Sequence, residues 1–446
     1  MEVLKERDLY SEDFETVQRE GREDPRWLQE DRRAGMERFL QLGFPTRKQE
    51  EWRFSDFRSL ARTGFTPSLS GKGSFSAKDL SQLPFSELRC PRLVFVNGAL
   101  RPDLSRFEET AGLTVTTLRS ALRNSPEGVE AHLGKHAVLG NNPFVALNAA
   151  LSRNGFFIHV DPGTIETEPV HVLHVTTDSS QPVRTHLRNL VVVGDNSQFT
   201  LVECYVGAGD NVTFTNPVTE VVVGANSIVR HYRLQNESRR GFHVGCNEVC
   251  QDRDSHYRTL SIDLGSLLTR NDFRCVLDGE GCLAGIDGLY LLKGRQHLDN
   301  YTTLEHVRPH CDSRELFKGV LDERARGIFR GRIIVHKDAQ KTDSKQTNNN
   351  LLLSDHSLVN TKPQLEIYAD DVKCTHGATI GQLDSEALFY LRSRGISRAA
   401  ARSILIFGFA SEVIDRVRVS SLRDQLVEYL IDWLPQGKLV RGVYEG

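Results

Sequence analysis

A cysteine and a histidine stand two residues apart in the stretch "DDVKCTHGATIG", residues 370–381. If this stretch is a β-strand, Cys374 and His376 point to the same side, with Cβ atoms about 6 to 7 Å apart. That separation is too long for direct proton transfer, and no sequence context for an oxyanion hole accompanies it, so a Cys-His hydrolase is disfavoured. The same spacing suits two ligands of one iron ion or iron-sulfur cluster, because thiolate and imidazole are both good donors.

Two ligands do not close a metal site. If Cys374 and His376 bind iron, the remaining ligands come from elsewhere in the fold or from another chain, which predicts a transient or shared site. The alternative is that the pair only packs, as a buried cysteine and a hydrogen-bonded histidine. The residues alone leave both interpretations open.

Two other groups of residues could carry chemistry. Cys246 and Cys250 form a CxxxC pair three residues after His243, but no second pair lies at zinc-finger spacing, so a metal site there is disfavoured. Carboxylates that could serve a β-helix carbohydrate-active enzyme, a lyase or hydrolase, form an alternative function. These are Asp252, Asp254, Asp278, Glu280 and Asp287.

Nucleotide-binding motifs are missing from the sequence. There is no GxxxxGK[ST], and "VGAGDNV", residues 206–212, has Val212 where a dinucleotide fingerprint needs its third glycine. We therefore expect that this chain binds no nucleotide itself. If ATP takes part in the function, a partner must bring it.

The middle of the chain, residues 153–383, consists of short β-rich runs separated by Gly, Asn and Asp. Within it "VVVGDNSQF", residues 191–199, recurs as "VVVGANSIV", residues 221–229. A fixed period of this size is typical of a solenoid, and Gly and Asn tolerate the positive φ that its corners need. The sequence therefore predicts a mainly β solenoid core, with a large β-sandwich as the alternative.

Helical patterns flank this core. Residues 1–152 form a helical and mixed region. Within it, residues 24–44 carry apolar side chains at helical spacing with Gly43 as the stop, and residues 45–61 predict a second helix containing Trp52. Residues 384–446 predict a helical domain. Its middle helix is apolar nearly all round, so it is either buried against the β core or available for docking another chain.

Composition narrows the class of protein. The formal net charge of −3 over 446 residues argues against a nucleic-acid footprint, and no apolar run is long enough to span a membrane. The charged first 20 residues lack a signal-peptide h-region, which predicts a cytoplasmic protein. In that compartment the eight cysteines are expected to stay reduced, without structural disulfides.

Two stretches resemble a known family. "PQLEIYADDVKCTHGATIGQLDSEALFYLRSRGIS", residues 363–397, and "GFPTRKQEEWRFSD", residues 43–56, are similar to the SufD branch of the SufB/SufD family of Fe-S cluster assembly proteins. The resemblance implies a right-handed parallel β-helix between helical regions. It also implies a non-catalytic scaffold subunit of the SUF complex.

The resemblance further implies partners and site residues. It predicts pairing with a SufB-like paralogue, contact of the helices from residue 384 to about 432 with a SufC-like ABC-type ATPase, and indirect receipt of sulfur from a cysteine desulfurase. A homodimer in isolation is a further expectation. Carried over by position, Cys374 and His376 lie near the SufB interface, where transient iron or a cluster is assembled.

Overall fold

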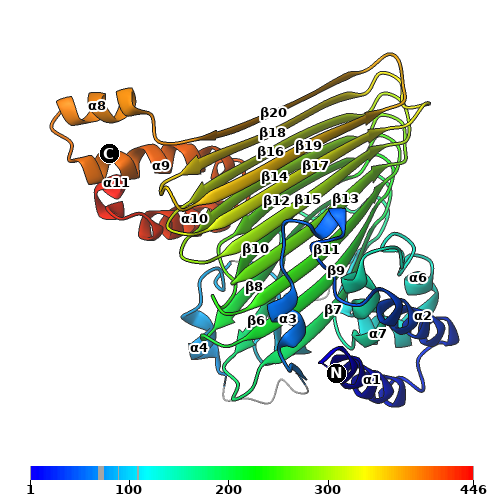
Figure 1. The fold of residues 1–446 in the computed structure, drawn as a ribbon. Helices are drawn as coiled ribbons and strands as arrows, with labels where there is room; N and C mark the ends of the chain where they lie inside the picture. The colour runs from blue at the N-terminus through cyan, green and yellow to red at the C-terminus, as the bar shows by residue number, and fades with distance from the viewer. Residues whose placement is uncertain (1, 69–74, 89, 108–109, 445–446) are drawn as a thin grey trace.

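Two ten-stranded sheets form the body of the molecule, and successive strands alternate between them (Figure 1). The structure is a computed structural model that describes residues 2–68, 75–88, 90–107 and 110–444. Sheet A has the order β19-β17-β15-β13-β11-β9-β7-β5-β4, with β1 paired to β7, and sheet B has the order β20-β18-β16-β14-β12-β10-β8-β6-β2-β3.

From β5 onward the strands lie one above another, and they pair in parallel within each sheet. Their bounds are β5 Phe156–Val160, β6 Val170–Thr177, β7 Val183–Val193, β8 Gln198–Ala208, β9 Thr213–Val223, β10 Ile228–Asn236, β11 Phe242–Gln251, β12 His256–Asp263, β13 Leu268–Leu277, β14 Leu283–Leu292, β15 His297–His306, β16 Asp312–Leu321, β17 Arg326–Val335, β18 Asp343–Leu352, β19 Leu358–Ile367 and β20 Lys373–Gly381. This is a parallel β-solenoid, as predicted, and a β-sandwich of antiparallel strands is excluded.

The 30-residue repeat seen in the sequence is one coil of the solenoid. Val191 pairs with Val221, and the intervening corners superpose, so that the Asn226 side-chain amide donates to Asn196 Oδ1 at 2.9 Å. The two asparagines have φ of 58° and 57°. The corner therefore uses the left-handed conformation that Asn tolerates.

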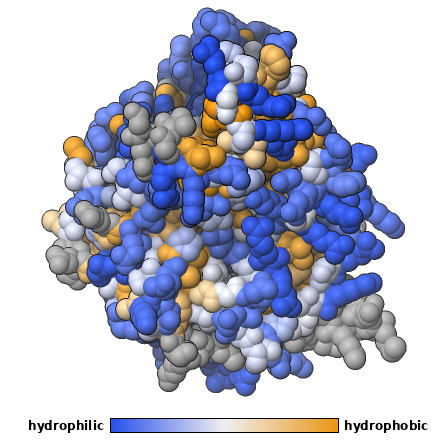
Figure 2. Space-filling model, turned by 90° about the vertical axis from the view of Figure 1, so that its left-hand side faces the viewer, coloured by the Kyte–Doolittle hydropathy of each residue, from blue (hydrophilic) through white to orange (hydrophobic). Residues whose placement is uncertain are grey.

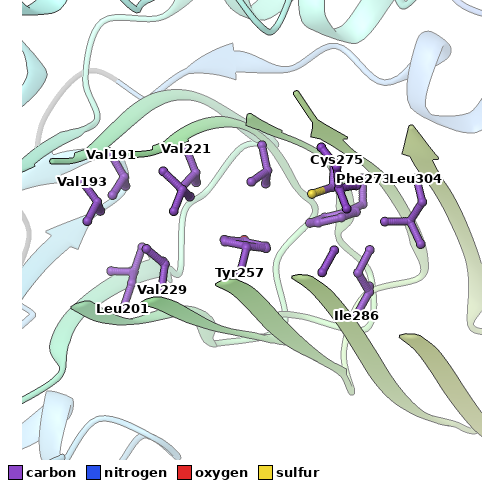
Figure 3. Close-up of a cluster of buried hydrophobic side chains, with 14 of the residues drawn as sticks. Val191, Val193, Leu201, Val221, Val229, Tyr257, Phe273, Cys275, Ile286 and Leu304 are labelled. Atoms are coloured by element: carbon purple, nitrogen blue, oxygen red, sulfur yellow. The ribbon is translucent and has the colours of Figure 1, made fainter. Parts of the chain in front are cut away.

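Apolar side chains from both sheets meet inside the solenoid (Figure 3). Val191 and Val221 of sheet A face Leu201 and Val229 of sheet B, and all four are no more than 1% exposed. Because strand side chains alternate in direction, every second residue of each strand contributes to this interior. The alternation fixes which residues can reach the inside at every coil.

The N-terminal region caps one end of the solenoid. Strands β2 and β4 extend the two sheets beyond β6 and β5, and helix α7 is buried along its whole length. The remaining elements here are α1 Glu2–Glu20, α2 Arg26–Leu42, the 3-10 helix η1 Glu50–Trp52, α3 Arg58–Arg62, β1 Thr66–Pro67, α4 Ala77–Ser81, β2 Arg92–Val96, β3 Ala99–Leu100, β4 Leu113–Thr117, α5 Leu118–Asn124, α6 Pro126–Glu130 and α7 Pro143–Leu151.

One of the two expected N-terminal helices is present and the other is not. Helix α2 ends before Gly43, whose φ is 62°, as predicted. The helix expected over residues 45–61 is replaced by η1, α3 and irregular chain. This segment instead lies over sheet A: Trp52 is 3% exposed beneath the Arg270 guanidinium, and Ser55 Oγ donates to Asp299 Oδ2 at 2.6 Å. These contacts hold the segment in an irregular conformation, so tertiary contacts override the local pattern.

The C-terminal helices are α8 Ser385–Ser393, α9 Arg398–Ile414, α10 Ser420–Trp433 and α11 Gly437–Tyr444. Helix α9 buries Ile406, Phe407 and Ala410 in a cluster that includes Leu289 and Val320 of sheet B. The apolar surface of this middle helix is therefore used for packing against the β body. No helix within the described ranges is long and apolar enough to cross a membrane, and each of the eight cysteines is a free thiol.

Candidate functional site

Strand β20 closes the series of sheet B strands and pairs only with β18. In this pairing Cys374 lies beside Ser344 and His376 lies beside Gln346. Ser344 and Gln346 are each 1% exposed and point into the solenoid. Cys374 and His376 therefore share the inward side of the last strand, while Thr375 between them is on the outer side.

The two residues have different surroundings. Cys374 is half-buried and packs against the interior apolar cluster, so burial, with the nearby Asp343 carboxylate, raises the pKa of its thiol. His376 is exposed, because no further strand lies over β20. Within the described part of the chain, no group of three or more His, Cys, Asp or Glu side chains is placed to hold a metal ion. Cys374 and His376 are thus at most two ligands of a site.

The end of the solenoid around β20 is uncovered. Strands β19 and β20 are both edge strands, and helix α8 follows β20 after only residues 382–384 (Figure 1). Six of the nine exposed large apolar side chains in the described residues belong to the last coil or to α8, although they make up a small part of the chain. The six are Leu358, Ile367, Tyr368, Ile380, Phe389 and Tyr390.

The face of the molecule that carries the C-terminal helices is mainly hydrophilic, with separate apolar patches (Figure 2). Helix α8 has no buried residue, and Phe389 and Tyr390 are 73% and 58% exposed. Exposed aromatic side chains of this size are typical of surfaces that another chain covers. We name β19, β20 and α8 together the open end.

The CxxxC group does not assemble. Cys246 lies on the outer side of β11 against Ala137 and Val145, whereas His243 points inside, three residues earlier, with its Nδ1 2.7 Å from Glu237 Oε2. Residues three apart on a strand face opposite sides. His243 and Cys246 therefore cannot bind one ion.

Comparison with known proteins decides the family. A family model described as "SUF system FeS cluster assembly, SufBD core domain" matches residues 174–409, and a model of the "SufBD protein N-terminal region" matches residues 5–172. The chain belongs to the SufBD family. SufBD proteins assemble Fe-S clusters in the SUF system, so the chain is an Fe-S cluster assembly protein of this family.

Three relatives show where in the SufBD family the similarity lies. An iron-sulfur cluster assembly SufBD family protein of Synechocystis sp. is 34% identical over 394 residues, which is 86% of each chain. The iron-sulfur cluster assembly protein SufD of Escherichia coli is 33% identical over 90% of this chain and 92% of its own. SufB of Bacillus subtilis is 24% identical over 91% of this chain and 88% of its own.

Four of the five carboxylates that a carbohydrate-active enzyme would need lie in two stacked corners of this SufBD protein, and the fifth lies on a strand. Asp252, Asp254, Asp278 and Glu280 lie in the corners before β12 and β14, where Asp254 pairs with Arg253 at 2.8 Å. Asp287 lies elsewhere, on β14, in an ion pair with Arg416 at 2.6 Å. The five carboxylates do not converge on one cleft, so nothing in this SufBD structure favours the enzyme alternative.

Polar residues beneath the SufBD open end were missed by sequence analysis. Strand β18 presents four polar side chains to the interior, each no more than 3% exposed, and they are Ser344, Gln346, Asn348 and Asn350. Below Gln346, Glu315 is 3% exposed, and burial raises its pKa to about 7. The signal available in the sequence was a strand-length run of eight polar residues, "DSKQTNNN", within the β-rich core.

Proposed function

We propose that this chain is a non-catalytic scaffold subunit of a SUF complex, in which it supplies Cys374 and His376 to a transient iron or Fe-S cluster site that a partner completes. One observation carries the proposal: both side chains lie on the inward side of β20, an edge strand with only one neighbour. The iron or cluster is the cargo of this site rather than a resident cofactor. Side chains whose Cβ atoms are about 6 to 7 Å apart suit such cargo, because an ion or cluster can bridge their donor atoms.

The partner at the open end is a SufB-like paralogue. An edge strand carries a row of unpaired N–H and C=O groups, and a strand of another chain can pair with them. The exposed Leu358, Ile367 and Ile380 would be covered by the same contact. A paralogue with a matching end would continue the sheets and bring the missing ligands next to Cys374 and His376.

The C-terminal helices hold a SufC-like ATPase. Helix α9 is used for packing against sheet B, whereas α8 has no buried residue and exposes Phe389 and Tyr390. Docking is therefore assigned to α8 rather than to the apolar α9. The chain carries no nucleotide motif, so ATP is bound by this partner, and sulfur reaches the complex from a cysteine desulfurase.

Co-expression of the chain with a SufB-like paralogue and a SufC-like ATPase tests the proposal. Copurification of the three proteins with iron and visible absorbance is expected. Cys374→Ser and His376→Asn should leave the complex intact and remove most of its iron. Thr375→Val, on the outer side of the same strand, is the matched control and should retain iron. Normal iron content in both site variants would contradict the assignment, as would turnover of any substrate by the chain alone.

A further inference from the structure

A column of polar side chains leads from inside the solenoid to His376. The pairing of β16, β18 and β20 places Glu315, Gln346 and His376 in register, one residue per coil. On β14, one coil further from the open end, Ile286 is in register with Glu315. Further in, the same register position holds Thr259 on β12 and His231 on β10, so Ile286 separates those polar side chains from the stretch that runs from Glu315 to the open end.

A hydrogen bond joins Glu315 and Gln346, the two buried members of this column. The Gln346 amide donates from Nε2 to Glu315 Oε2 at 2.5 Å, and both side chains are buried. Gly331 of β17 lies against this amide, and a Cβ at that position would collide with it. Glu315 thus holds the Gln346 amide through a hydrogen bond, and the missing Cβ at residue 331 leaves the space that this amide fills.

The other amide atom, Gln346 Oε1, is also buried and has no hydrogen-bond partner among the described residues. Leaving a buried carbonyl oxygen unpaired destabilises the folded chain. The nearest position toward the open end is that of His376. An imidazole N–H is a donor that this oxygen can accept.

A second column lies two residues along the same strands and ends at Cys374. His306 Nε2 lies 2.9 Å from Ser313 Oγ, and Ser313 Oγ lies 2.6 Å from Ser344 Oγ. Ser344 is in register with Cys374, and Ala284 precedes Ser313 one coil further in. From β16 to β20, the two columns therefore end at the two candidate ligands.

We propose that Gln346, anchored by Glu315, is a positioning residue for His376. Its Oε1 accepts the N–H of one imidazole nitrogen, which fixes the tautomer and leaves the other nitrogen unprotonated and available as a ligand. The inference rests on the proposed function, because a fixed tautomer matters only if His376 binds cargo. Neighbours that orient a ligand in this way change metal affinity by about 10- to 100-fold when they are replaced.

Nitrogen NMR of the full-length chain, labelled with ¹⁵N in the histidine rings and free of iron, tests the inference. The His376 signals are identified by their loss in His376→Asn. In the wild type they should report one tautomer, and in Gln346→Met, which keeps the volume and removes the acceptor, a mixture. Gln346→Asn, which withdraws the acceptor by one methylene, should give the same mixture and serves if Gln346→Met does not fold.

Asn348→Leu is the matched control, because Asn348 is equally buried on the same side of β18 but lies in register with Ala378. It should leave the His376 signals unchanged. An unchanged tautomer in both Gln346 variants, or the same change in the control, would overturn the inference. This readout needs neither iron nor partners, so its failure is distinct from a failure of the iron measurements on the complex.

Discussion

At the scale of single residues, the buried Glu315 beneath the open end has an unusual protonation behaviour. Glu315 has an apolar residue beneath it and an amide above it, and burial raises the pKa of its carboxyl to about 7. A carboxyl that keeps its proton near neutral pH is a neutral hydrogen-bonding group in a place where a charge would be costly. Glu315 Oε2 can accept the Gln346 amide hydrogen bond with or without that proton.

Stability should respond to pH at this residue. Because the pKa of Glu315 is raised from 4.5 to about 7 in the folded chain, its contribution is fully present below pH 4.5 and is lost as the pH rises through about 7. Glu315→Gln should therefore raise the free energy of unfolding by on the order of 3 kcal/mol at pH 8, with little gain at pH 4.5. Urea denaturation at the two pH values measures this difference.

Glu366→Gln is the control for that measurement. The half-exposed Glu366 carboxylate accepts two hydrogen bonds from Arg332, and these lower its pKa, so its replacement should bring no gain at pH 8. An equal gain from Glu315→Gln at both pH values would contradict the assignment of a raised pKa to Glu315.

At this scale the sequence predicted part of the candidate site. Cys374 and His376 were found because their spacing is itself informative. Glu315 and Gln346 lie 31 residues apart, and their proximity follows from the register of β16 and β18. Because residues 343–350 are all polar, the sequence does not show which of them face the interior, so the column could not be predicted.

At the scale of elements, the short connection between β20 and α8 joins the proposed contact with the SufB-like paralogue to the proposed contact with the SufC-like ATPase. Only residues 382–384 separate the strand that carries Cys374 and His376 from the helix assigned to the ATPase. A partner that binds two conformations with different affinity can alter a distant site, and a short connection transmits such a change directly.

Cross-linking across the open end tests this coupling. In a Cys374→Ser background, a cysteine introduced as Thr379→Cys on β20 should form a disulfide with a cysteine on the SufB-like partner, with a yield that changes when ATP is added. Ile165→Cys, far from β20 in the chain and 62% exposed, is the control and should form no such link. A cross-linking yield that does not depend on ATP would rule out coupling between α8 and β20 through residues 382–384.

The elements themselves were predicted unevenly. The repeat of "VVVG" and its Asn-Ser corner was enough to predict the solenoid, because corner chemistry is local. The irregular chain around Trp52 was mistaken for a helix, because its structure depends on Arg270 and Asp299, more than 200 residues away. Contacts of that range leave no mark on local periodicity.

At the scale of the whole molecule, the two ends of the solenoid differ. The end near β5 is capped by β2, β4 and α7, whereas the end at β20 is open. Solenoids need caps because an uncovered coil offers pairing groups and apolar surface to other chains. The sequence indicated helices at both ends, and only the pairing of β2 and β4 shows which end is covered.

The isolated chain is therefore predicted to form a homodimer through its open end. Ile380→Lys, at a residue that is 48% exposed on β20, should shift the chain to monomer in sedimentation velocity at increasing concentration. Ile165→Lys makes the same change at an exposed residue away from β20 and should leave the dimer intact. A wild-type chain that stays monomeric at every concentration would refute the prediction.

The irregular segment that carries Ser55 has a consequence for biosynthesis. Its anchor, Asp299, leaves the ribosome 244 residues later, so the segment must wait undocked while the fourteen strands β1 to β14 are made. Synthesis reaches β19, β20 and α8 only after the coils beneath them have had time to stack, and α9 to α11 follow. The candidate ligands thus emerge on a body already formed, and the nascent chain does not display its open end to partners before the earlier coils can fold.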